Sequence, residues 1–401
     1  MASAIIVGAG PAGATLSYLL ARRGVTVTLI ERQTDFGREF RGEVLMPSGI
    51  DALEQAGLGV AAHDLPRLAI PAVQIFRGVA PLAKISLASL PRTPTVVPQG
   101  TMLEMIAAEA AKFSGFALER GATMRDLIME SGRVAGVRAD TISGPREFRA
   151  NFVIAADGRT SAVRKRLGLE VEHIQQGFDV VWTHVPGRFL DNQTACFVFG
   201  SGHLFILYPS PEGHLQIGWV IKKGKYADFR KLGADGWFGA MAPYLPTVIV
   251  EFLTPRRDAL AHPVLLDVVC DRIRDWTVPG ALLIGDAAHP MSPVGAQGIN
   301  IALRDAIVAG NHLGRAFAAG ASPENLDAAA RAVQAERAPE IVTIQNMQQM
   351  GPRLQFGDTF YSRALTSRPF AWFAKTFLAG FLARRIDPML NGVTKVRLDP
   401  S

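Results

Sequence analysis

Residues 4–31 read AIIVGAGPAGATLSYLLARRGVTVTLIE, and this stretch decides the fold. The apolar run at 4–7 is typical of a buried parallel strand. An apolar helical pattern follows over 14–22 and ends before Gly24, a residue suited to a helix C-cap. The run at 25–30 predicts a second strand, which Glu31 closes. Together these segments predict a β-α-β unit and a chain of the α/β class.

The three glycines of this unit have separate physical roles. Gly8 permits the tight turn, Gly10 lets a pyrophosphate approach the backbone, and Gly13 allows the helix to pack closely on the sheet. The helix N-terminus offers free N–H groups and the positive end of its dipole to phosphates. Glu31 can accept hydrogen bonds from a ribose hydroxyl and repels a 2′-phosphate. The stretch predicts a dinucleotide site, and by itself it leaves both NAD and FAD open.

Two later segments repeat the pattern of a strand followed by a carboxylate. Residues 152–164 read FVIAADGRTSAVR, and residues 281–290 read ALLIGDAAHP, followed by a glycine loop and a helix from about 301. Asp157 and Asp286 thus follow strands at their carboxyl ends, where such sheets bind ligands. The alternative is that each aspartate only completes a turn or caps a helix. The occurrence of all three segments in this order favours one shared site.

Composition and charge exclude several classes of protein. Hydrophobic residues make up 48% of the 401 residues and charged residues 19%, which excludes a disordered or collagen-like chain. The two cysteines, Cys196 and Cys270, allow neither a disulfide framework nor a thiolate metal cluster, and they indicate a reducing, cytoplasmic location. We expect no signal peptide and no membrane span. The net charge of +6 suits an anionic cofactor or a membrane surface, whereas scattered basic residues argue against nucleic acid.

With these motifs, the chain resembles the class A FAD-dependent monooxygenases. This is the p-hydroxybenzoate hydroxylase-like family, which includes the ubiquinone-biosynthesis hydroxylases. The resemblance rests on GAGPAG, DGRTSAVR and GDAAHPMSPVGAQGIN, and it covers residues 4 to about 315. It implies FAD as the bound cofactor. Only one full glycine fingerprint occurs, so NADH or NADPH is expected to bind transiently as the electron donor.

The resemblance also implies roles for individual residues. Asp286 would bind the ribityl chain, and Asn300 with its two predecessors would offer backbone groups to the pyrimidine edge of the flavin. Arg41 would lie near the flavin, and Met124 would give a backbone contact to adenine. Gln99 stands where many members carry an arginine. The implied cofactor-binding residues are Gly8, Gly10, Gly13, Glu31, Arg32, Arg41, Gln99, Met124, Asp157, Asp286, Gly295, Gly298, Ile299 and Asn300.

The domain organisation follows from a change of pattern after Gly168. Short strands at 178–184, 194–199, 203–208 and 214–221 predict a mostly antiparallel sheet, to which the stretch 72–85 adds a strand. We therefore expect an α/β fold: a Rossmann-like FAD-binding domain with an inserted, mostly antiparallel β-sheet substrate domain and C-terminal helices. The expected boundaries are FAD-binding parts at 1–72, 96–172 and 268–330, substrate-sheet parts at 73–95 and 173–267, and a C-terminal helical region at 331–401.

The expected activity is hydroxylation of an aromatic or quinone-like small molecule. The resemblance implies that reduced flavin reacts with O₂ to form a C4a-hydroperoxide, so the protein needs no strong acid or base of its own. Catalytic residues stay unassigned, and no hydrolase triad or HExxH pattern stands out. The candidates for the substrate pocket are Tyr208, Trp219, Pro293 and His289, with Trp182, His184 and Phe205 as further aromatic residues whose alternative is the sheet core. Two other functions remain: a reductase that saturates isoprenoid double bonds, and a flavin-binding protein without turnover.

The C-terminal stretch 370–383 reads FAWFAKTFLAGFLA and is followed by Arg384 and Arg385. Its aromatic residues recur at helical spacing, but it is too short to span a bilayer. It predicts either a helix docked on the body or in a dimer contact, or peripheral contact with a membrane. Both a monomer and a homodimer remain open.

Overall fold

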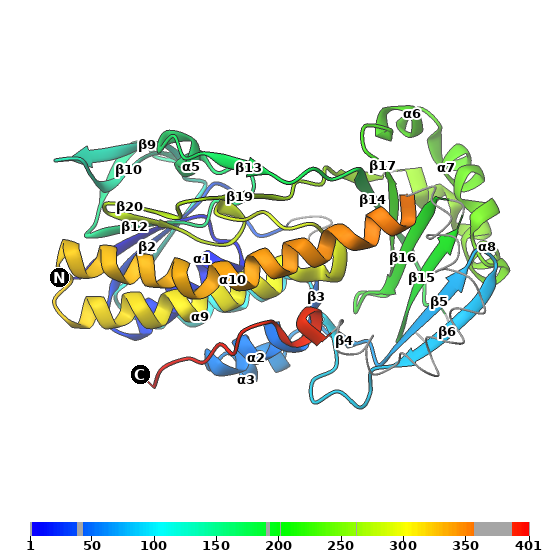
Figure 1. Cartoon of the computed structure of the whole chain (residues 1–401), viewed down its shortest axis with the longest axis horizontal. Coiled ribbons are helices and arrows are strands. Elements are labelled where there is room, and N and C mark those ends of the chain that lie inside the picture. Colours follow the sequence, from blue (N-terminus) through cyan, green and yellow to red (C-terminus); the bar gives the residue numbers. More distant parts are fainter. Residues whose placement is uncertain are drawn as a thin grey trace.

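The structure is a computed structural model that describes residues 2–37, 43–189, 193–200, 202–261, 263–356 and 387–400. The molecule is elongated, with two long helices running along much of its length and a large sheet at one end (Figure 1). No helix in the described ranges has the length and apolarity to cross a bilayer. The segment 370–385, for which a docked helix or membrane contact was predicted, lies outside these ranges.

A six-stranded sheet carries the first β-α-β unit. Its strand order is β20-β21-β12-β1-β2-β8, and every pairing is parallel except that of the edge strand β20. The strands are β1 (Ser3–Val7), β2 (Thr26–Glu31), β8 (Phe116–Arg120), β12 (Phe152–Ala155), β20 (Thr277–Val278) and β21 (Ala281–Leu283). Their residues are largely buried, as the apolar runs predicted. The expected α/β fold class is confirmed.

Helices and small sheets enclose this sheet. Helix α1 packs against α4 and α9, and α9 also packs against α2 and α10. The helices are α1 (Pro11–Arg22), α2 (Pro47–Gln55), α3 (Gly59–His63), α4 (Gln99–Ala110), α5 (Ala162–Arg166), α9 (Gln297–Ala318) and α10 (Pro323–Phe356). The small sheets comprise β9 (Thr123–Glu130), β10 (Arg133–Thr141) and β11 (Gly144–Arg149); β13 (Val171–His173) and β19 (Asp271–Ile273); and β3 (Val44–Leu45), β7 (Thr95–Val96) and β4 (Leu68–Ala69).

A seven-stranded sheet stands at the other end of the molecule. Its order is β18-β14-β17-β16-β15-β5-β6, and only the β15–β5 pairing is parallel. The strands are β5 (Ala72–Arg77), β6 (Ala80–Ser86), β14 (Phe178–Pro186), β15 (Thr194–Gly200), β16 (His203–Pro209), β17 (His214–Lys222) and β18 (Val264–Leu266). The stretch 72–85, predicted as one strand, forms most of a hairpin because Gly78 adopts a φ of 55° in its turn.

Three α-helices and two 3₁₀ helices, none of them predicted from the sequence, cover one face of this sheet. They are α6 (Tyr226–Arg230), α7 (Gly233–Met241), α8 (Thr247–Leu253) and the 3₁₀ helices Ala242–Tyr244 and Thr254–Ala261. Apolar side chains of these helices form one buried cluster with side chains of the sheet, including Trp219 and Trp237. The opposite face of the sheet is turned towards the FAD-binding part of the chain, because Val294 packs against it.

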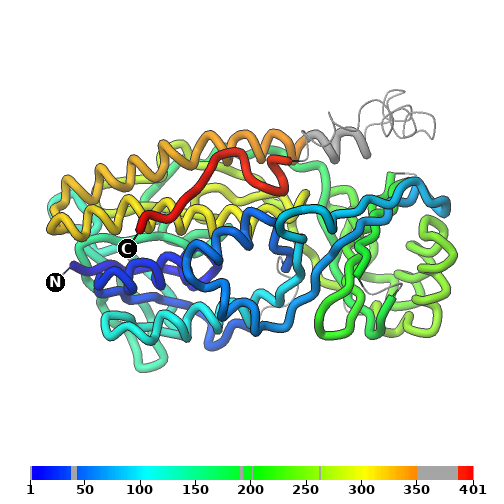
Figure 2. The backbone as a smooth tube through the Cα atoms, turned by 90° about the horizontal axis from the view of Figure 1, so that it is seen from below, coloured from blue at the N-terminus to red at the C-terminus, as the bar shows by residue number. Residues whose placement is uncertain are grey.

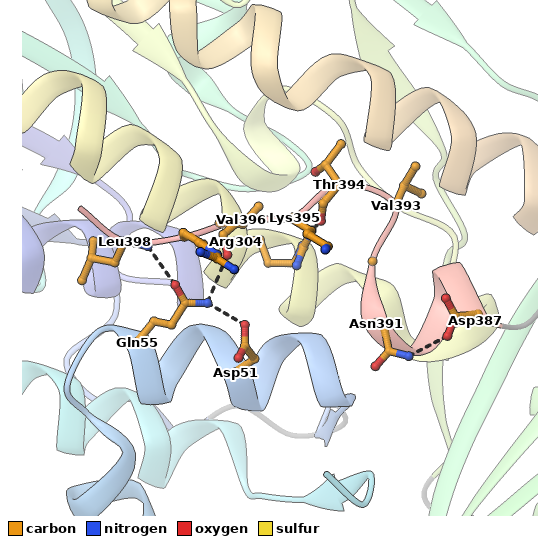
Figure 3. A pocket seen from close by; sticks show the side chains of 12 residues that line it. Asp51, Gln55, Arg304, Asp387, Asn391, Val393, Thr394, Lys395, Val396 and Leu398 are labelled. Carbon is orange, nitrogen blue, oxygen red and sulfur yellow. Dashed lines mark hydrogen bonds between the residues drawn. The ribbon is translucent and has the colours of Figure 1, made fainter. Parts of the chain in front are cut away.

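The last described segment, residues 387–400, runs back along α9 and α2 (Figure 2). Side chains of the helices hold its backbone: Asn311 Nδ2 donates to the carbonyl of Arg397 at 2.7 Å, and Gln55 Nε2 donates to that of Val396 at 3.1 Å. Figure 3 shows the polar groove that this tail forms with α2, where Gln55 also accepts from the backbone N–H of Leu398. The tail is therefore part of the folded body.

Candidate active site

The three motifs meet at the carboxyl edge of the six-stranded sheet. Val7 pairs with Ala155, and Ala155 pairs with Leu283, so the loops after β1, β12 and β21 emerge side by side. An ion pair then joins the second motif to the third, since Arg159 Nε lies 3.2 Å from Asp286 Oδ2. The structure confirms the predicted convergence of the three segments.

The first loop is shaped for a close approach of backbone and ligand. Gly8 has a φ of +99°, and a Cβ there would collide with the carbonyl of Ala156. A Cβ on Gly13 would collide with the carbonyl of Gly8, so the helix lies directly on the turn. A Cβ on Gly10 would meet no atom within 4 Å. Because no side chain caps the N-terminus of α1, its N–H groups are available to an anion.

The carboxylate of Glu31 lies beneath this loop. The residue is 2% exposed, Oε2 accepts from the backbone N–H of Ala9 at 2.9 Å, and Oε1 accepts from that of Gln33 at 3.0 Å. Arg32 is exposed, and Met124 and Gln99 are buried on β9 and at the start of α4. Arg41 lies outside the described residues. The contacts of these residues with FAD stay predictions.

Asp157 caps the helix that follows it. Oδ1 accepts from Ser161 Oγ at 2.5 Å, and Oδ2 accepts from the backbone N–H groups of Ala162 at 2.7 Å and Val163 at 3.1 Å. Burial raises the pKa of Asp157, and these hydrogen bonds oppose the shift. The capping role considered for this aspartate is therefore present, and any contact with the cofactor would be additional.

Arg164 is a residue that the sequence analysis missed. Its side chain is buried, with Nη1 donating to the carbonyl of Ala287 at 2.8 Å and Nη2 to that of Arg159 at 2.7 Å. The planar guanidinium therefore joins the second and third motifs from below. The signal available in the sequence was spacing, because Arg164 follows the capping residue Ser161 by three positions. In the structure the backbone N–H of Arg164 donates to Ser161 Oγ.

The glycine loop of the third motif ends in a strained turn at the start of α9. Gly295 and Ala296 have φ values of 75° and 52°, and Ala296 is one of few non-glycine residues with positive φ in the described chain. Asn300 Nδ2 donates to the carbonyls of Ala296 at 2.6 Å and Val44 at 3.2 Å. Its Oδ1 accepts from the backbone N–H of Met46 at 2.8 Å.

The side chain of Asn300 thus ties this loop to β3. Ile299 is buried beside it, while a Cβ on Gly298 would meet no atom within 4 Å. The backbone at the start of α9 is therefore approachable by a planar ring with electronegative edge atoms. Taken with the open Gly10 turn, the residues present fit FAD.

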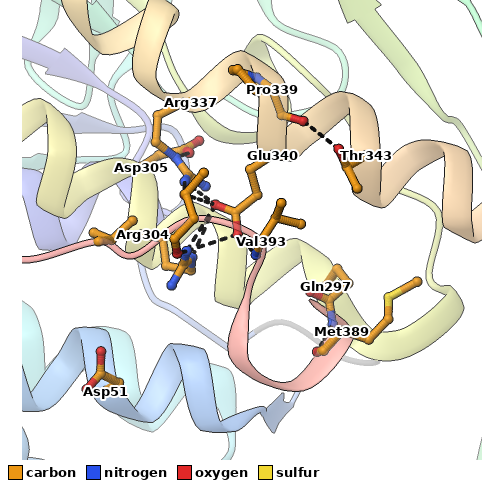
Figure 4. Close-up of polar contacts among 12 residues, drawn as sticks. Asp51, Gln297, Arg304, Asp305, Arg337, Pro339, Glu340, Thr343, Met389 and Val393 are labelled. Carbon is orange, nitrogen blue, oxygen red and sulfur yellow. Dashed lines mark hydrogen bonds and ion pairs between the residues drawn. The ribbon is translucent and has the colours of Figure 1, made fainter. Parts of the chain in front are cut away.

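His289 is fully buried and is therefore not placed to contact a substrate. Its ring has no exposed surface, and Nε2 lies 2.8 Å from Asp305 Oδ2. Asp305 also accepts from the backbone N–H of Gly285 at 3.0 Å and from Arg337 Nε at 2.7 Å. Figure 4 shows the rest of this buried charge cluster on α9 and α10, in which Glu340 binds Arg304 at 2.9 Å. The position of His289 is that of a structural residue.

The aromatic candidates divide between the two faces of the seven-stranded sheet. Trp219 pairs with Phe205, stacks on it at 5.4 Å between ring centroids, and packs under the covering helices. Trp219 is therefore core, which was the alternative weighed for it. Tyr208 points to the opposite face, where its ring centroid lies 5.9 Å from that of Trp182.

The loop of the third motif reaches this same face. Val294, which follows the partly exposed Pro293, packs against a buried cluster that contains Phe178 and Val180. Trp182 contacts both this cluster and the one around Tyr208. The loop of the third motif therefore lies against the same face of the sheet that bears Trp182 and Tyr208.

Comparison with known proteins agrees with this geometry. The family model described as FAD binding domain matches residues 1–223 and 265–343, leaving out the segment that carries α6–α8. The chain is 31% identical over 318 residues to 6-methylpretetramide 4-monooxygenase of Streptomyces rimosus, covering 76% of this chain and 73% of that protein. It is 26% identical over 324 residues to digeranylgeranylglycerophospholipid reductase 2 of Methanothermobacter thermautotrophicus, covering 79% and 78%.

A solved structure shows the same fold. The crystal structure of p-nitrophenol 4-monooxygenase PnpA from Pseudomonas putida DLL-E4 superposes with a TM-score of 0.81 at 20% identity, over 98% of this chain and 100% of that one. With the family match over most of its length, this chain belongs to the class A FAD-dependent monooxygenases, oxidoreductases that draw electrons from NADH or NADPH.

Proposed function

We propose that this chain hydroxylates an aromatic or quinone-like small molecule held between the flavin loop and the Tyr208 face of the seven-stranded sheet. The observation that carries the proposal is the packing of Val294, in the flavin loop, on the face that bears Trp182 and Tyr208. The likeness to a protein named for 4-monooxygenation of 6-methylpretetramide supports it. The proposed FAD parts of the chain are 1–72, 96–172 and 268–330, and the proposed substrate parts are 73–95 and 173–267.

The protein's own contribution is placement and exclusion of water. The Gly8–Gly13 turn would hold the pyrophosphate, Asp286 the ribityl chain, and the start of α9 the pyrimidine edge of FAD. When bound and reduced, FAD supplies the oxygen-activating chemistry. The aromatic face of the sheet would hold the ring of the substrate at a fixed distance and keep bulk water away.

The test is a reaction balance on the holoenzyme. A panel of aromatic and quinone-like compounds is screened for stimulated NAD(P)H oxidation, with O₂ uptake and product mass measured in the same samples. Hydroxylation consumes one NAD(P)H, one proton and one O₂ per product and releases one water. Labelled O₂ should place one labelled oxygen atom in the product.

The likeness to an isoprenoid reductase favours one other function. A reductase would add two hydrogens to its substrate without substrate-dependent O₂ uptake, and that result would replace the hydroxylase assignment. If no compound of the panel stimulates NAD(P)H oxidation by FAD-loaded protein, the proposal of an aromatic substrate is wrong.

A further inference from the structure

Glu43 is a carboxylate beside the candidate site that no motif drew attention to. It precedes β3, and its backbone carbonyl accepts from the N–H of Val97 at 2.8 Å. The next residue, Val44, is bound by Asn300, the residue that ties the flavin loop to β3. Glu43 therefore directly precedes a residue that is hydrogen-bonded to the start of α9.

One oxygen of the Glu43 carboxylate lacks a hydrogen-bond donor among the described residues. This atom, Oε2, is buried and has no hydrogen-bond partner among those residues. Within the same part of the chain, a second acid, Glu212, in the turn between β16 and β17, acts on it electrostatically. Burial, with a smaller contribution from Glu212, raises the pKa of Glu43 to about 7. A buried acceptor without a donor lowers stability, and such groups concentrate where a ligand completes them.

Tyr208 lies within electrostatic reach of this carboxylate. Burial is the main cause that raises the pKa of the Tyr208 hydroxyl, and Glu43 raises it further. Among the described residues that hydroxyl makes no hydrogen bond. Its ring meets Trp182 edge to face, and the cluster around it includes Val44 and Val96 of the β3–β7 pair. An aromatic surface and an acceptor that has no donor among the described residues therefore lie near each other, beside the β3 segment that Asn300 ties to the flavin loop.

We propose that Glu43 recognises the substrate by accepting a hydrogen bond, and then the proton, from a phenolic hydroxyl whose ring lies against Tyr208 and Trp182. The proton moves from the substrate oxygen to Glu43 Oε2: the substrate O–H bond breaks, the carboxyl O–H bond forms, and no electrons are exchanged. The resulting phenolate is an electron-rich ring, which electrophilic oxygenation requires. Glu43 and Glu212 together also disfavour substrates that carry a carboxylate there. This inference rests on the proposed function and narrows its substrate class.

The test compares two probes on the FAD-loaded enzyme. 2-Naphthol and 2-methoxynaphthalene share a ring system, but only the first has a hydroxyl donor, and each is titrated by the change in flavin absorbance. We expect the wild type to bind 2-naphthol at least about 10-fold more tightly, the usual value of one hydrogen bond to a charged acceptor. Glu43→Gln keeps only a neutral acceptor, so it should reduce that preference to about 3-fold or less while binding 2-methoxynaphthalene as before. Glu212→Gln, which removes the neighbouring exposed charge, should keep the preference.

The pH dependence provides a second readout. Affinity of the wild type for 2-naphthol should fall as the pH decreases through about 7, because Glu43 becomes protonated and loses the negative charge that strengthens this hydrogen bond. The profile should be flat in Glu43→Gln and retained in Glu212→Gln, and Tyr208 stays protonated throughout since its pKa is raised. Flavin content per chain shows that each variant is folded.

Three results would overturn the inference. They are equal affinity of the wild type for both probes, a preference that is undiminished in Glu43→Gln, and failure of the holoenzyme to bind either probe. The oxygen-incorporation assay is separate from this comparison. If aromatic compounds drive O₂ incorporation while the probes show no preference, the proposed hydroxylase stands and Glu43 has no part in recognition.

Discussion

The guanidinium of Arg159 lies 3.2 Å from the carboxylate of Asp286, across 127 positions of sequence. Both side chains are partly exposed, at 26% and 30%, so the pair sits at the accessible edge of the sheet. Arg164, buried beneath them, donates to the carbonyls of Arg159 and Ala287. The two motifs are thus joined by an accessible ion pair and by a buried arginine. The accessible residues Arg159 and Asp286 can contact the cofactor, whereas Arg164 holds the two loops together.

We predict that Asp286→Ala loses FAD but stays folded. Its carboxylate is partly exposed, and its ion-pair partner among the described residues is the equally accessible Arg159. Removing this carboxylate should therefore weaken FAD binding more than it lowers the free energy of unfolding. Flavin absorbance per chain after gel filtration should fall to less than half of the wild-type value, with unchanged far-UV circular dichroism. Asp140→Ala, which breaks the exposed pair with Arg125, is the control and should retain FAD. Full flavin occupancy in Asp286→Ala would remove this residue from the cofactor site.

Arg164→Met should destabilise the protein. The substitution leaves the buried carbonyl of Ala287 and the partly buried carbonyl of Arg159 without their charged donor, which typically costs about 2–4 kcal/mol in the free energy of unfolding. Urea denaturation of the apoprotein measures this without the contribution of FAD. Arg166→Met removes an exposed arginine two residues along the same helix and should cost about 1 kcal/mol or less. Equal effects of the two substitutions would contradict the bridging role of Arg164.

Asp305 should contribute to stability in an acid-dependent way. The neighbouring His289 and Arg337 lower the pKa of this buried carboxyl to about 2 despite the opposing effect of burial. A carboxyl whose pKa is lowered by folding stabilises fully above its unfolded pKa of about 4, and the contribution is lost as the pH falls towards 2. The wild type should therefore lose about 1 kcal/mol from this group between pH 5 and pH 3, and about 2.5 kcal/mol in total once the pH is below 2.

Asp305→Asn should be less stable than the wild type at pH 7 by about 3 kcal/mol, because Arg337 and His289 lose their buried partner. Its unfolding midpoint should then change less between pH 5 and pH 3. Denaturant titrations at several pH values provide the comparison. Parallel pH profiles for the two proteins would show that another group governs acid stability.

Gly392→Ala tests the docking of the C-terminal tail. Gly392 has a φ of +82°, and a Cβ there would lie 2.6 Å from Arg304 Cζ, which would disturb the Arg304–Glu340 pair. Gly320 has a φ of +99°, but a Cβ there would meet nothing within 4 Å. Gly320→Ala therefore measures backbone strain alone, about 1–2 kcal/mol. We expect Gly392→Ala to cost at least about 1 kcal/mol more in thermal or urea unfolding, and equal losses would mean that the tail accommodates the methyl group.

Tyr208→Phe should lower the amount of hydroxylated product formed per NAD(P)H oxidised. The change keeps the ring against Trp182 and removes only the hydroxyl, so the flavin content should not change. Tyr244→Phe is the matched control, since Tyr244 contacts His203 and packs with the core under the covering helices. Product yield and hydrogen peroxide are measured together with a substrate found in the panel. Unchanged yield in Tyr208→Phe would place its hydroxyl outside the reaction.

Much of the fold could be predicted from local patterns. The β-α-β unit was expected at 4–7, 14–22 and 25–30, and it is observed at Ser3–Val7, Pro11–Arg22 and Thr26–Glu31. The strands of the seven-stranded sheet between 178 and 222 begin where they were predicted. The convergence of the motifs was predictable because parallel strands end at one edge of a sheet. The β-α-β unit and the strand positions depend on residues near one another in sequence, and the convergence follows from the shared direction of the parallel strands.

Other features were decided only by tertiary structure. Tyr208 and Trp219 are both aromatic strand residues, and only the register of β16 with β17 and the helices over one face separate a substrate candidate from a core residue. His289 belongs to a recognisable motif, but it is buried against Asp305 on α9, which is in turn paired with Arg337 on α10. Local sequence sets backbone conformation through turn chemistry and hydrophobic periodicity. The partner of a buried charge, and the face on which a side chain ends, depend on which distant segments pack together.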